Sequence, residues 1–182
     1  MFRTLDIVFS LIGLVVGFPV FLVLYVLGLF DTGAPLFVQE RVGLNLEPFN
    51  VVKFRTMSVK TPQVATHLAD ANSVTRYGRF LRKTKLDELP QLWNVLIGDM
   101  SLVGPRPPIV TQYELIDLRK ENGAISCRPG LTGLAQVNSF DGMSVQDKAA
   151  FDGTYAQNIT FLNDLAIILK TFVYLLKPPP KY

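Results

Sequence analysis

The chain has 182 residues, the length of one ordinary domain, and combines 49% hydrophobic and 18% charged residues with a formal net charge of +3. This balance and a mean hydropathy of +0.29 exclude intrinsic disorder, a fibre and a highly charged nucleic-acid tail, and they are typical of a membrane-associated protein. The single cysteine, Cys127, excludes an intramolecular disulfide and a cysteine-rich zinc site, and the single histidine, His67, excludes a polyhistidine metal cluster.

The first long segment, residues 5–30, is apolar apart from Asp6, Ser10 and Tyr25. As one straight helix it would be roughly 39 Å long, which exceeds the roughly 30 Å hydrocarbon core of a bilayer. Pro19 lies in its middle and predicts a kink or break, because proline removes a backbone donor and collides with the preceding turn. The segment alone fits a kinked spanning helix, the more common arrangement, or a re-entrant hairpin that returns to the same side.

Two other interpretations of this segment fit less well. A secretory signal peptide is disfavoured because no small-residue cleavage pattern follows, and a buried core helix because so long an apolar run has no polar face. Of the 18 Lys and Arg residues, all but Arg3 follow residue 30. The positive-inside rule therefore predicts that the C-terminal part lies in the cytoplasm.

Beyond residue 30, strand-favouring and helix-favouring runs are separated by Gly, Pro and polar residues. In chain order they predict a β-hairpin over residues 36–42 and 49–57, an exposed loop over 61–73, a helix over 86–97 with Pro90 at its first helical position, a loop over 98–108, a helix over 109–120, and two turns before a short strand within 128–137. Residues 161–177 predict an amphipathic helix that lies on the core or on the membrane surface.

The most informative local feature is an acidic pair, Asp87 and Glu88, which follows five basic residues within 76–85 and lies at or just before a predicted helix start. A helix N-terminus offers free N–H groups and a positive dipole end, so phosphate is its natural guest. Carboxylates there can hold Mg²⁺ or attack an electrophile. Taken alone, the pair is more simply explained as helix-capping charges paired with Lys83 and Lys85.

Four further basic residues and one acidic residue are candidates for phosphate or metal binding. Arg106 lies between two prolines on a stiff loop, which would lose little conformational entropy on binding an anion. Arg128 precedes a similar Pro-Gly turn, and Lys53 and Arg55 occupy alternate strand positions that face the same side. Asp152 is a candidate second metal ligand, although a helix cap is the simpler role. For each basic residue, a solvated turn or strand face is the alternative.

Four sequence blocks, read together, give the chain its resemblance to a known family. They are Lys53-Phe-Arg-Thr-Met57, Leu86-Asp-Glu-Leu-Pro-Gln91, Gly98-Asp-Met-Ser101 continuing into Gly104-Pro-Arg-Pro107, and Arg128-Pro-Gly-Leu-Thr-Gly-Leu-Ala-Gln-Val137. With them, nearly the whole chain resembles the bacterial sugar transferases, the monotopic polyprenyl-phosphate phosphoglycosyl transferases. We expect a compact member of that family, because no further membrane segment precedes the catalytic part.

The resemblance implies an α+β fold, with residues 1–30 as a re-entrant membrane helix-break-helix. Residues 31–182 would form a compact, mainly helical cytoplasmic catalytic domain with a small β-hairpin and interfacial amphipathic helices. The implied reaction transfers a phospho-sugar from a UDP-sugar to polyprenyl (undecaprenyl) phosphate and releases UMP, as the first membrane step of glycan assembly.

The resemblance also implies roles for individual residues. Asp87 would form a covalent aspartyl phospho-sugar, Glu88 would assist as a metal or acid–base group, and Mg²⁺ would be held by Asp87 or Asp152. The diphosphate and the acceptor phosphate would be bound by Lys53, Arg55, Arg82, Arg106 and Arg128.

The implied location is the bacterial inner (cytoplasmic) membrane, with the catalytic domain on the cytoplasmic face. The implied partners are the UDP-sugar, polyprenyl phosphate and membrane lipid, and a homodimer is a further expectation. A nucleic-acid partner is not expected, because the basic cluster adjoins a carboxylate pair and has few stacking aromatics. Two other functions stay open: a phosphodiesterase or pyrophosphatase that directs water at a diphosphate, and a non-catalytic module that binds anionic lipid or nucleotide.

Overall fold

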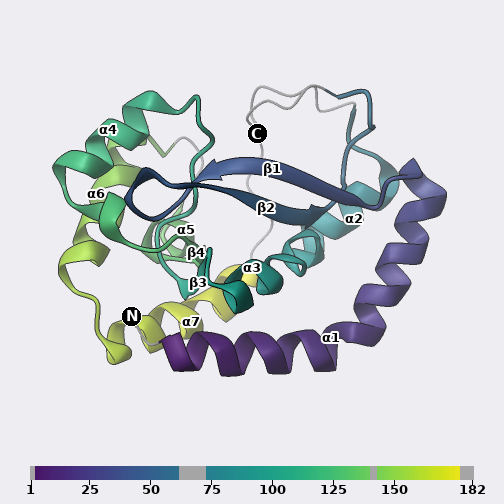
Figure 1. Ribbon diagram of the computed structural model, residues 1–182, viewed down its shortest axis with the longest axis horizontal. Coiled ribbons are helices and arrows are strands. Elements are labelled where there is room, and N and C mark those ends of the chain that lie inside the picture. Colours follow the sequence, from purple (N-terminus) through teal and green to yellow (C-terminus); the bar gives the residue numbers. More distant parts are fainter. Residues whose placement is uncertain (1–2, 62–72, 140–142, 177–182) are drawn as a thin grey trace.

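The computed structural model describes residues 3–61, 73–139 and 143–176 (Figure 1). Its helices are α1 (Arg3–Thr32), α2 (Arg76–Thr84), α3 (Gln91–Ile97), α4 (Tyr113–Glu121), α5 (Leu134–Val137), α6 (Val145–Gln157) and α7 (Phe161–Leu175). Its strands are β1 (Leu36–Val42), β2 (Pro48–Phe54), β3 (Ser101–Val103) and β4 (Gly130–Thr132), and short 3₁₀ turns cover Leu44–Leu46, Leu86–Glu88 and Ala124–Ser126. The prediction of a mixed, mainly helical chain with a β-hairpin is confirmed. Most of the predicted 61–73 loop, with His67, lies outside the described residues.

β1 and β2 form the predicted antiparallel hairpin, and the pairing extends over the whole length of both strands. β2 ends at Phe54 rather than at residue 57. Its other edge is covered by a side chain: Asn94 of α3 accepts a hydrogen bond from the Val52 N–H (3.1 Å) and donates one to the Asn50 carbonyl (2.7 Å). This buried amide satisfies the strand edge and attaches α3 to the hairpin.

The second sheet differs from the sequence-based expectation. β3 and β4 pair in parallel, so part of the predicted 98–108 loop is a strand. Within 128–137 the strand comes first and the residues after it form α5, the reverse of the predicted order. The segments approach closely at two glycines, where a Cβ on Gly130 would lie 2.1 Å from the Gly104 nitrogen. Strands this short show no alternating pattern, so their pairing depends on contacts distant in sequence.

α1 is, within the described part of the chain, the helix long and apolar enough to cross a membrane. It contains Pro19, and Figure 1 shows that it bends about midway along its length; because the helix continues to Thr32, this is a kink and not a break. The half before the kink packs on α3 at Gly13, where a Cβ would lie 2.9 Å from the Leu92 Cδ1. Close packing of α1 on α3 therefore depends on a glycine, which has no side chain, at position 13.

Polar contacts attach the N-terminal end of α1 to the rest of the chain. Asp6 is buried, and its carboxylate accepts hydrogen bonds from the Ser101 Oγ (2.9 Å) and the Leu102 N–H (2.9 Å) of β3. Arg3 donates to the Leu96 carbonyl (2.6 Å) at the end of α3, where a cation also complements the helix dipole. Arg3 and Asp6 thus attach the start of α1 to the folded domain.

The C-terminal half of α1 is attached in the same way. Tyr77 of α2 donates a hydrogen bond to the Leu24 carbonyl at 2.7 Å. Thr75, the N-cap of α2, donates to the Asp31 Oδ2 at 2.7 Å. Both ends of α1 therefore contact one folded unit.

α7 lies on the core through Ile167, which is 1% exposed and clusters with Val103 and Tyr155. Its outer face is apolar, with exposed Leu162, Leu165, Leu169, Phe172, Val173 and Leu176. This spacing of three or four residues is that of one helix face. The prediction of a helix that lies on the core is confirmed over Phe161–Leu175, whereas its amphipathic, membrane-surface role stays a prediction. α4 differs from its prediction and begins at Tyr113 rather than at residue 109.

The core that positions the acidic pair lies between β2 and the helices next to it. Phe54 packs with Leu24 of α1 and Leu81 of α2, and Val51 packs with Val95 of α3. These contacts hold the end of α2 and the body of α3 against β2. The 3₁₀ turn that links the two helices is thereby fixed beside the strand.

Candidate active site

The acidic pair, Asp87 and Glu88, lies on the 3₁₀ turn between α2 and α3. α2 ends at Thr84, and its C-cap Lys85 adopts a left-handed conformation with φ 58° and turns the chain. α3 begins at Gln91 rather than at residue 86, because Leu86–Glu88 form the 3₁₀ turn, and Pro90 is its N-cap rather than its first residue. The prediction that the pair lies just before a helix start is confirmed.

Glu88 joins two basic residues from distant parts of the chain. Its Oε1 accepts a hydrogen bond from the Lys53 Nζ of β2 at 3.1 Å and another from the Arg106 Nη2 at 2.7 Å. The Glu88 and Lys53 side chains are mostly buried, whereas that of Arg106 is 43% exposed. The simpler interpretation from sequence, pairing with Lys83 and Lys85, is wrong for Glu88, because its partners come from β2 and from the proline-rich loop.

The two carboxyl groups of the pair have opposite electrostatic environments. Burial and the adjacent Glu88 charge raise the pKa of Asp87. Burial also acts to raise the pKa of Glu88, but the Arg106 and Lys53 charges outweigh it and hold that pKa well below its usual range. Glu88 is therefore ionised at neutral pH, whereas Asp87 holds a proton more tightly than an exposed aspartate does.

The Asp87 Oδ1 is buried and has no hydrogen-bond partner among the described residues. Buried polar atoms in native proteins are normally satisfied, so an unpartnered carboxyl oxygen marks a place where a ligand or a reacting group fits. Burial also lowers the pKa of Lys53, against the opposing Glu88 charge, which weakens the hold of this lysine on its proton. The arrangement can bind an anion and present a carboxylate to it.

Arg41 belongs to this site and is missed by the sequence analysis. Its Nη1 donates to the Pro107 carbonyl (3.2 Å) and its Nη2 to the Gln39 Oε1 (2.6 Å). Burial and the nearby Arg106 charge lower the pKa of Arg41 to about 10, against the Glu88 charge. The alternation of side chains along the strands could have identified it. Arg41 pairs with Phe49, which is four residues before Lys53 on β2, so Arg41 and Lys53 face the same side of the hairpin.

Asp152 lies inside α6, whose N-cap is Ser144, so the helix-cap interpretation is wrong. Its Oδ2 accepts hydrogen bonds from the Arg119 Nε (2.9 Å) and Nη2 (2.6 Å), and both side chains are almost fully buried. Among residues 3–61, 73–139 and 143–176, no group of three or more His, Cys, Asp or Glu side chains could hold a metal ion. The metal role of Asp152 stays a prediction, and its observed partner is a guanidinium.

The other predicted phosphate ligands have different surroundings. Arg55 turns to the start of β1, where its Nε and Nη2 donate to backbone carbonyls at 2.8 and 3.1 Å. The Arg82 Nε donates to the Thr56 Oγ1 at 3.0 Å. Arg128 precedes β4, and its segment packs against the Arg106 loop, since a Cβ on Gly104 would lie 2.3 Å from the Arg128 carbonyl. The structure thus brings Lys53 and Arg106 to the acidic pair and gives Arg55 and Arg82 contacts elsewhere.

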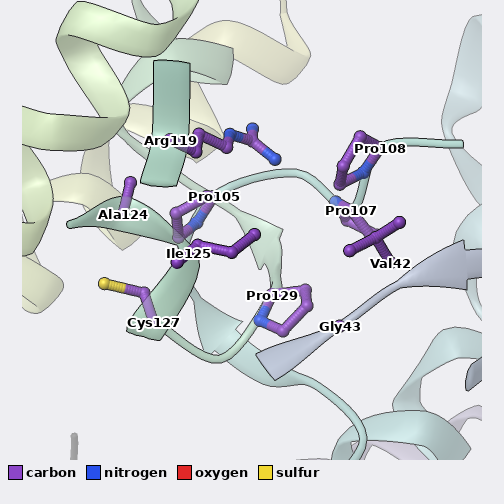
Figure 2. A pocket seen from close by; sticks show the side chains of 10 residues that line it. All are labelled: Val42, Gly43, Pro105, Pro107, Pro108, Arg119, Ala124, Ile125, Cys127 and Pro129. Carbon is purple, nitrogen blue, oxygen red and sulfur yellow. The ribbon is translucent and has the colours of Figure 1, made fainter. Parts of the chain in front are cut away.

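A small pocket adjoins the loop that carries Arg106 (Figure 2). Pro105, Pro107 and Pro108 line it together with Arg119, whose guanidinium extends toward the prolines in this view. Cys127 also lines it, and burial raises the pKa of its thiol. A thiol with a raised pKa is a weak nucleophile.

Comparison with known proteins places the chain in a family. The family described as bacterial sugar transferase matches residues 1–178. The chain is 37% identical over 187 residues to the exopolysaccharide production protein ExoY of Sinorhizobium fredii, covering 93% of this chain and 82% of that protein. The chain therefore belongs to the bacterial sugar transferase family, as its four sequence blocks indicate.

Two further relatives have names that describe a reaction. The chain is 42% identical over 159 residues to the UDP-glucose:undecaprenyl-phosphate glucose-1-phosphate transferase of Caulobacter vibrioides, covering 82% of this chain and 60% of that protein. It is 35% identical over 197 residues to the undecaprenyl-phosphate galactose phosphotransferase of Salmonella typhimurium, covering 99% and 41%. The chain likewise spans 39% and 41% of the length of relatives from Haemophilus influenzae and Erwinia amylovora.

Proposed function

We propose that this chain transfers a phospho-sugar from a UDP-sugar to a polyprenyl phosphate, releasing UMP and giving a polyprenyl-diphosphate-linked sugar. The observation that carries the proposal is the buried, unpartnered Oδ1 of Asp87, beside an ionised Glu88 that bonds two cations. The names of the Caulobacter and Salmonella relatives, both transferases that act with undecaprenyl phosphate, support the same class of reaction.

Asp87 is the proposed nucleophile. An oxygen of its ionised carboxylate attacks the β-phosphorus of the UDP-sugar, the bond from that phosphorus to the bridging oxygen breaks, and UMP leaves with the electron pair. The product is an aspartyl phospho-sugar, a mixed anhydride. A phosphate oxygen of the polyprenyl phosphate then attacks the same phosphorus and regenerates the carboxylate. The covalent intermediate divides one displacement into two easier steps.

Lys53, Arg106 and Arg41 would bind the phosphates of the donor. These three cations lie beside two carboxylates, Asp87 and Glu88, so the site keeps surplus positive charge for an anionic substrate even when both are ionised. The depressed pKa of Glu88 makes it a poor proton donor, and we assign it the orientation of Lys53 and Arg106 instead. This assignment replaces the acid–base role that the family resemblance implies.

Mg²⁺ fits this site through Asp87, because magnesium prefers carboxylate oxygens and the Asp87 Oδ1 is buried without a partner. When bound, the ion would neutralise charge on the diphosphate and favour the ionised form of Asp87. Asp152 fits less well, because its Oδ2 already accepts two hydrogen bonds from Arg119.

The second proposal concerns topology: α1 enters the bacterial inner membrane from the cytoplasm and returns to the same side. The kink in the helix that contains Pro19 supports it. Asp6 at one end binds β3, and Tyr77 of α2 binds the other half of the helix. Contacts of both halves of α1 with one folded unit favour an arrangement in which its two ends lie on the same side of the bilayer. The apolar outer face of α7 would then lie on the membrane surface.

Cysteine accessibility tests this topology. In a Cys127→Ser background, Phe2→Cys would report the N-terminal end and Lys60→Cys the catalytic domain, both probed with a membrane-impermeant maleimide on intact spheroplasts. We expect both cysteines to react only after lysis. Labelling of residue 2 in intact cells, with residue 60 still protected, would show that α1 spans the membrane.

The reaction is tested by UMP release from detergent-purified protein with Mg²⁺, across a panel of UDP-sugars. With one sugar we expect about one equivalent of UMP per enzyme without acceptor, and continuous release only after polyprenyl phosphate is added. Continuous release without acceptor would instead indicate hydrolysis. No release with any sugar, together with nucleotide binding, would indicate the non-catalytic module.

A further inference from the structure

The segment 104–108, which carries Arg106, has few backbone N–H donors of its own. Its three prolines, at 105, 107 and 108, supply no N–H donors. Four consecutive carbonyls are instead bonded from outside the segment: Pro105 by the Gly130 N–H (2.9 Å), Arg106 by the Arg119 Nη1 (2.9 Å), Pro107 by the Arg41 Nη1 (3.2 Å) and Pro108 by the Val42 N–H (3.0 Å). Because each of these carbonyls is bonded, the backbone of the loop is fixed, and so is the direction in which the Arg106 side chain leaves it.

Arg119 is the donor with the firmest support of its own. Its side chain is 3% exposed, and its Nε and Nη2 both donate to the Asp152 Oδ2. Because a guanidinium is planar, fixing one edge also fixes the direction of the donor on the remaining nitrogen. That remaining donor, Nη1, reaches the Arg106 carbonyl. α6 thus supports α4, and α4 supports the loop.

We propose that the buried Arg119–Asp152 pair is a positioning device that holds Arg106 in the direction needed to bind a phosphate. The proposal rests on the proposed function, since it gives Arg106 a diphosphate substrate. Neither Arg119 nor Asp152 touches the substrate in this assignment, and Asp152 acts through a guanidinium instead of through Mg²⁺. The effect on the reaction is one of orientation, where a displacement of about 1 Å costs about 100-fold in rate.

The chemistry of the pair allows its positioning role to be separated from folding. Replacing both partners of a buried ion pair with apolar residues of similar volume is often neutral for stability, whereas removing one partner leaves a buried charge. The informative variant is therefore the double substitution Arg119→Met with Asp152→Leu. The matched control removes the other ion pair of α4, the exposed Lys120–Asp117 pair at 2.8 Å, by Lys120→Gln with Asp117→Asn.

The first measurement needs no activity. Hydrogen exchange is followed at the amides of Gly104, Arg106 and Ile109, alongside the melting temperature of the detergent-purified protein. In the Arg119→Met/Asp152→Leu variant we expect a melting temperature close to that of the parent and at least 10-fold faster exchange in this segment. The control pair should leave both unchanged. If the double variant does not fold, Arg119→Lys replaces it, because lysine keeps the charge but cannot bond Asp152 and the Arg106 carbonyl as a fork.

The second measurement is UMP release with polyprenyl phosphate, in the parent and in an Arg106→Ala background. In the parent background, we expect Arg119→Met with Asp152→Leu to lower the rate of UMP release about 100-fold. In the Arg106→Ala background the same double substitution should cause no further loss of rate, because the side chain that it positions is absent. The Mg²⁺ concentration for half-maximal rate should stay the same. If Asp152 were a metal ligand, its replacement would raise this Mg²⁺ concentration.

These outcomes separate the proposals. Unchanged hydrogen exchange in a folded Arg119→Met/Asp152→Leu variant overturns the positioning role. A loss of rate that adds to the loss caused by Arg106→Ala also overturns it, and so does a higher Mg²⁺ concentration for half-maximal rate. If the parent protein releases no UMP, the proposed function fails, and the hydrogen-exchange result still decides whether the pair holds the loop.

Discussion

Glu88→Gln tests the electrostatic assignment of the acidic pair most directly, because it removes one charge and keeps the shape of the side chain. The Glu88 Oε1 holds Lys53 at 3.1 Å and Arg106 at 2.7 Å. A neutral amide holds these cations less firmly and no longer offsets their charge. We expect phosphate binding to be retained or strengthened and the rate of transfer to fall.

The size of the rate effect follows from the two contacts. A hydrogen bond to a charged group contributes about 1.5–3 kcal/mol. We take about 2 kcal/mol for the mostly buried Lys53 contact, and only about 1 kcal/mol for the Arg106 contact, because its 43% exposed side chain is screened by solvent. If both contacts orient cations in the transition state, losing all of this, about 3 kcal/mol, would lower kcat roughly 150-fold, which is the upper limit for an amide that still accepts weaker hydrogen bonds.

The assay measures kcat and KM for UMP release and, separately, UDP binding by calorimetry with Mg²⁺. Glu40→Gln is the matched control, because it removes the same charge from an exposed position on β1. We expect Glu88→Gln to show a much lower kcat with an unchanged or lower dissociation constant for UDP, and Glu40→Gln to resemble the parent. A parallel loss of affinity and rate would refute the reasoning, because Glu88 would then help to bind the substrate itself.

Four further outcomes follow from the site. Asp87→Asn should abolish turnover and the covalent phospho-sugar adduct detected by mass spectrometry in the absence of acceptor, with membrane association and melting temperature intact; near-normal turnover would exclude the nucleophile. Arg106→Ala should raise KM for the UDP-sugar and also lower kcat, without unfolding the protein. In the parent protein, activity is lost as pH falls through the raised pKa of Asp87. Lys53→Met should move this loss of activity to higher pH, because it removes a cation that lowers the pKa of both Asp87 and Glu88. Asp6→Ala should cost about 3 kcal/mol of stability, measured by chemical denaturation, because it leaves buried β3 donors unpaired.

Features encoded by neighbouring residues could be predicted from the sequence. The hairpin follows from Val- and Phe-rich runs around a Gly-containing turn, and the acidic pair precedes α3 as the spacing before Pro90 indicates. The apolar run of α1 and its kink follow from composition and from Pro19. In each case the determining interactions, backbone geometry and hydrophobic periodicity, act over a few residues and leave a readable pattern.

Short or irregular elements could not be predicted in the same way. β3 has three residues, and its partner β4 lies in another part of the chain, so neither shows a pattern of its own. Arg55 illustrates the same limit for side chains: its spacing from Lys53 predicts a shared phosphate contact, yet backbone carbonyls at the start of β1 accept its hydrogen bonds. An arginine within reach of unsatisfied carbonyls binds them, and only the fold determines which carbonyls are within reach.

By itself, the sequence determined the residue types of the site, the acidic pair at a helix start, the apolar kinked helix and the family. The tertiary structure decided the partners: Lys53 and Arg106 for Glu88, Arg41 beside them, and Arg119 for Asp152. These contacts join residues that are distant in sequence, and buried charges take whichever partner the packing brings within hydrogen-bond distance. Local pattern carries no record of that choice, because the cost of an unpaired buried charge arises only when the chain is folded.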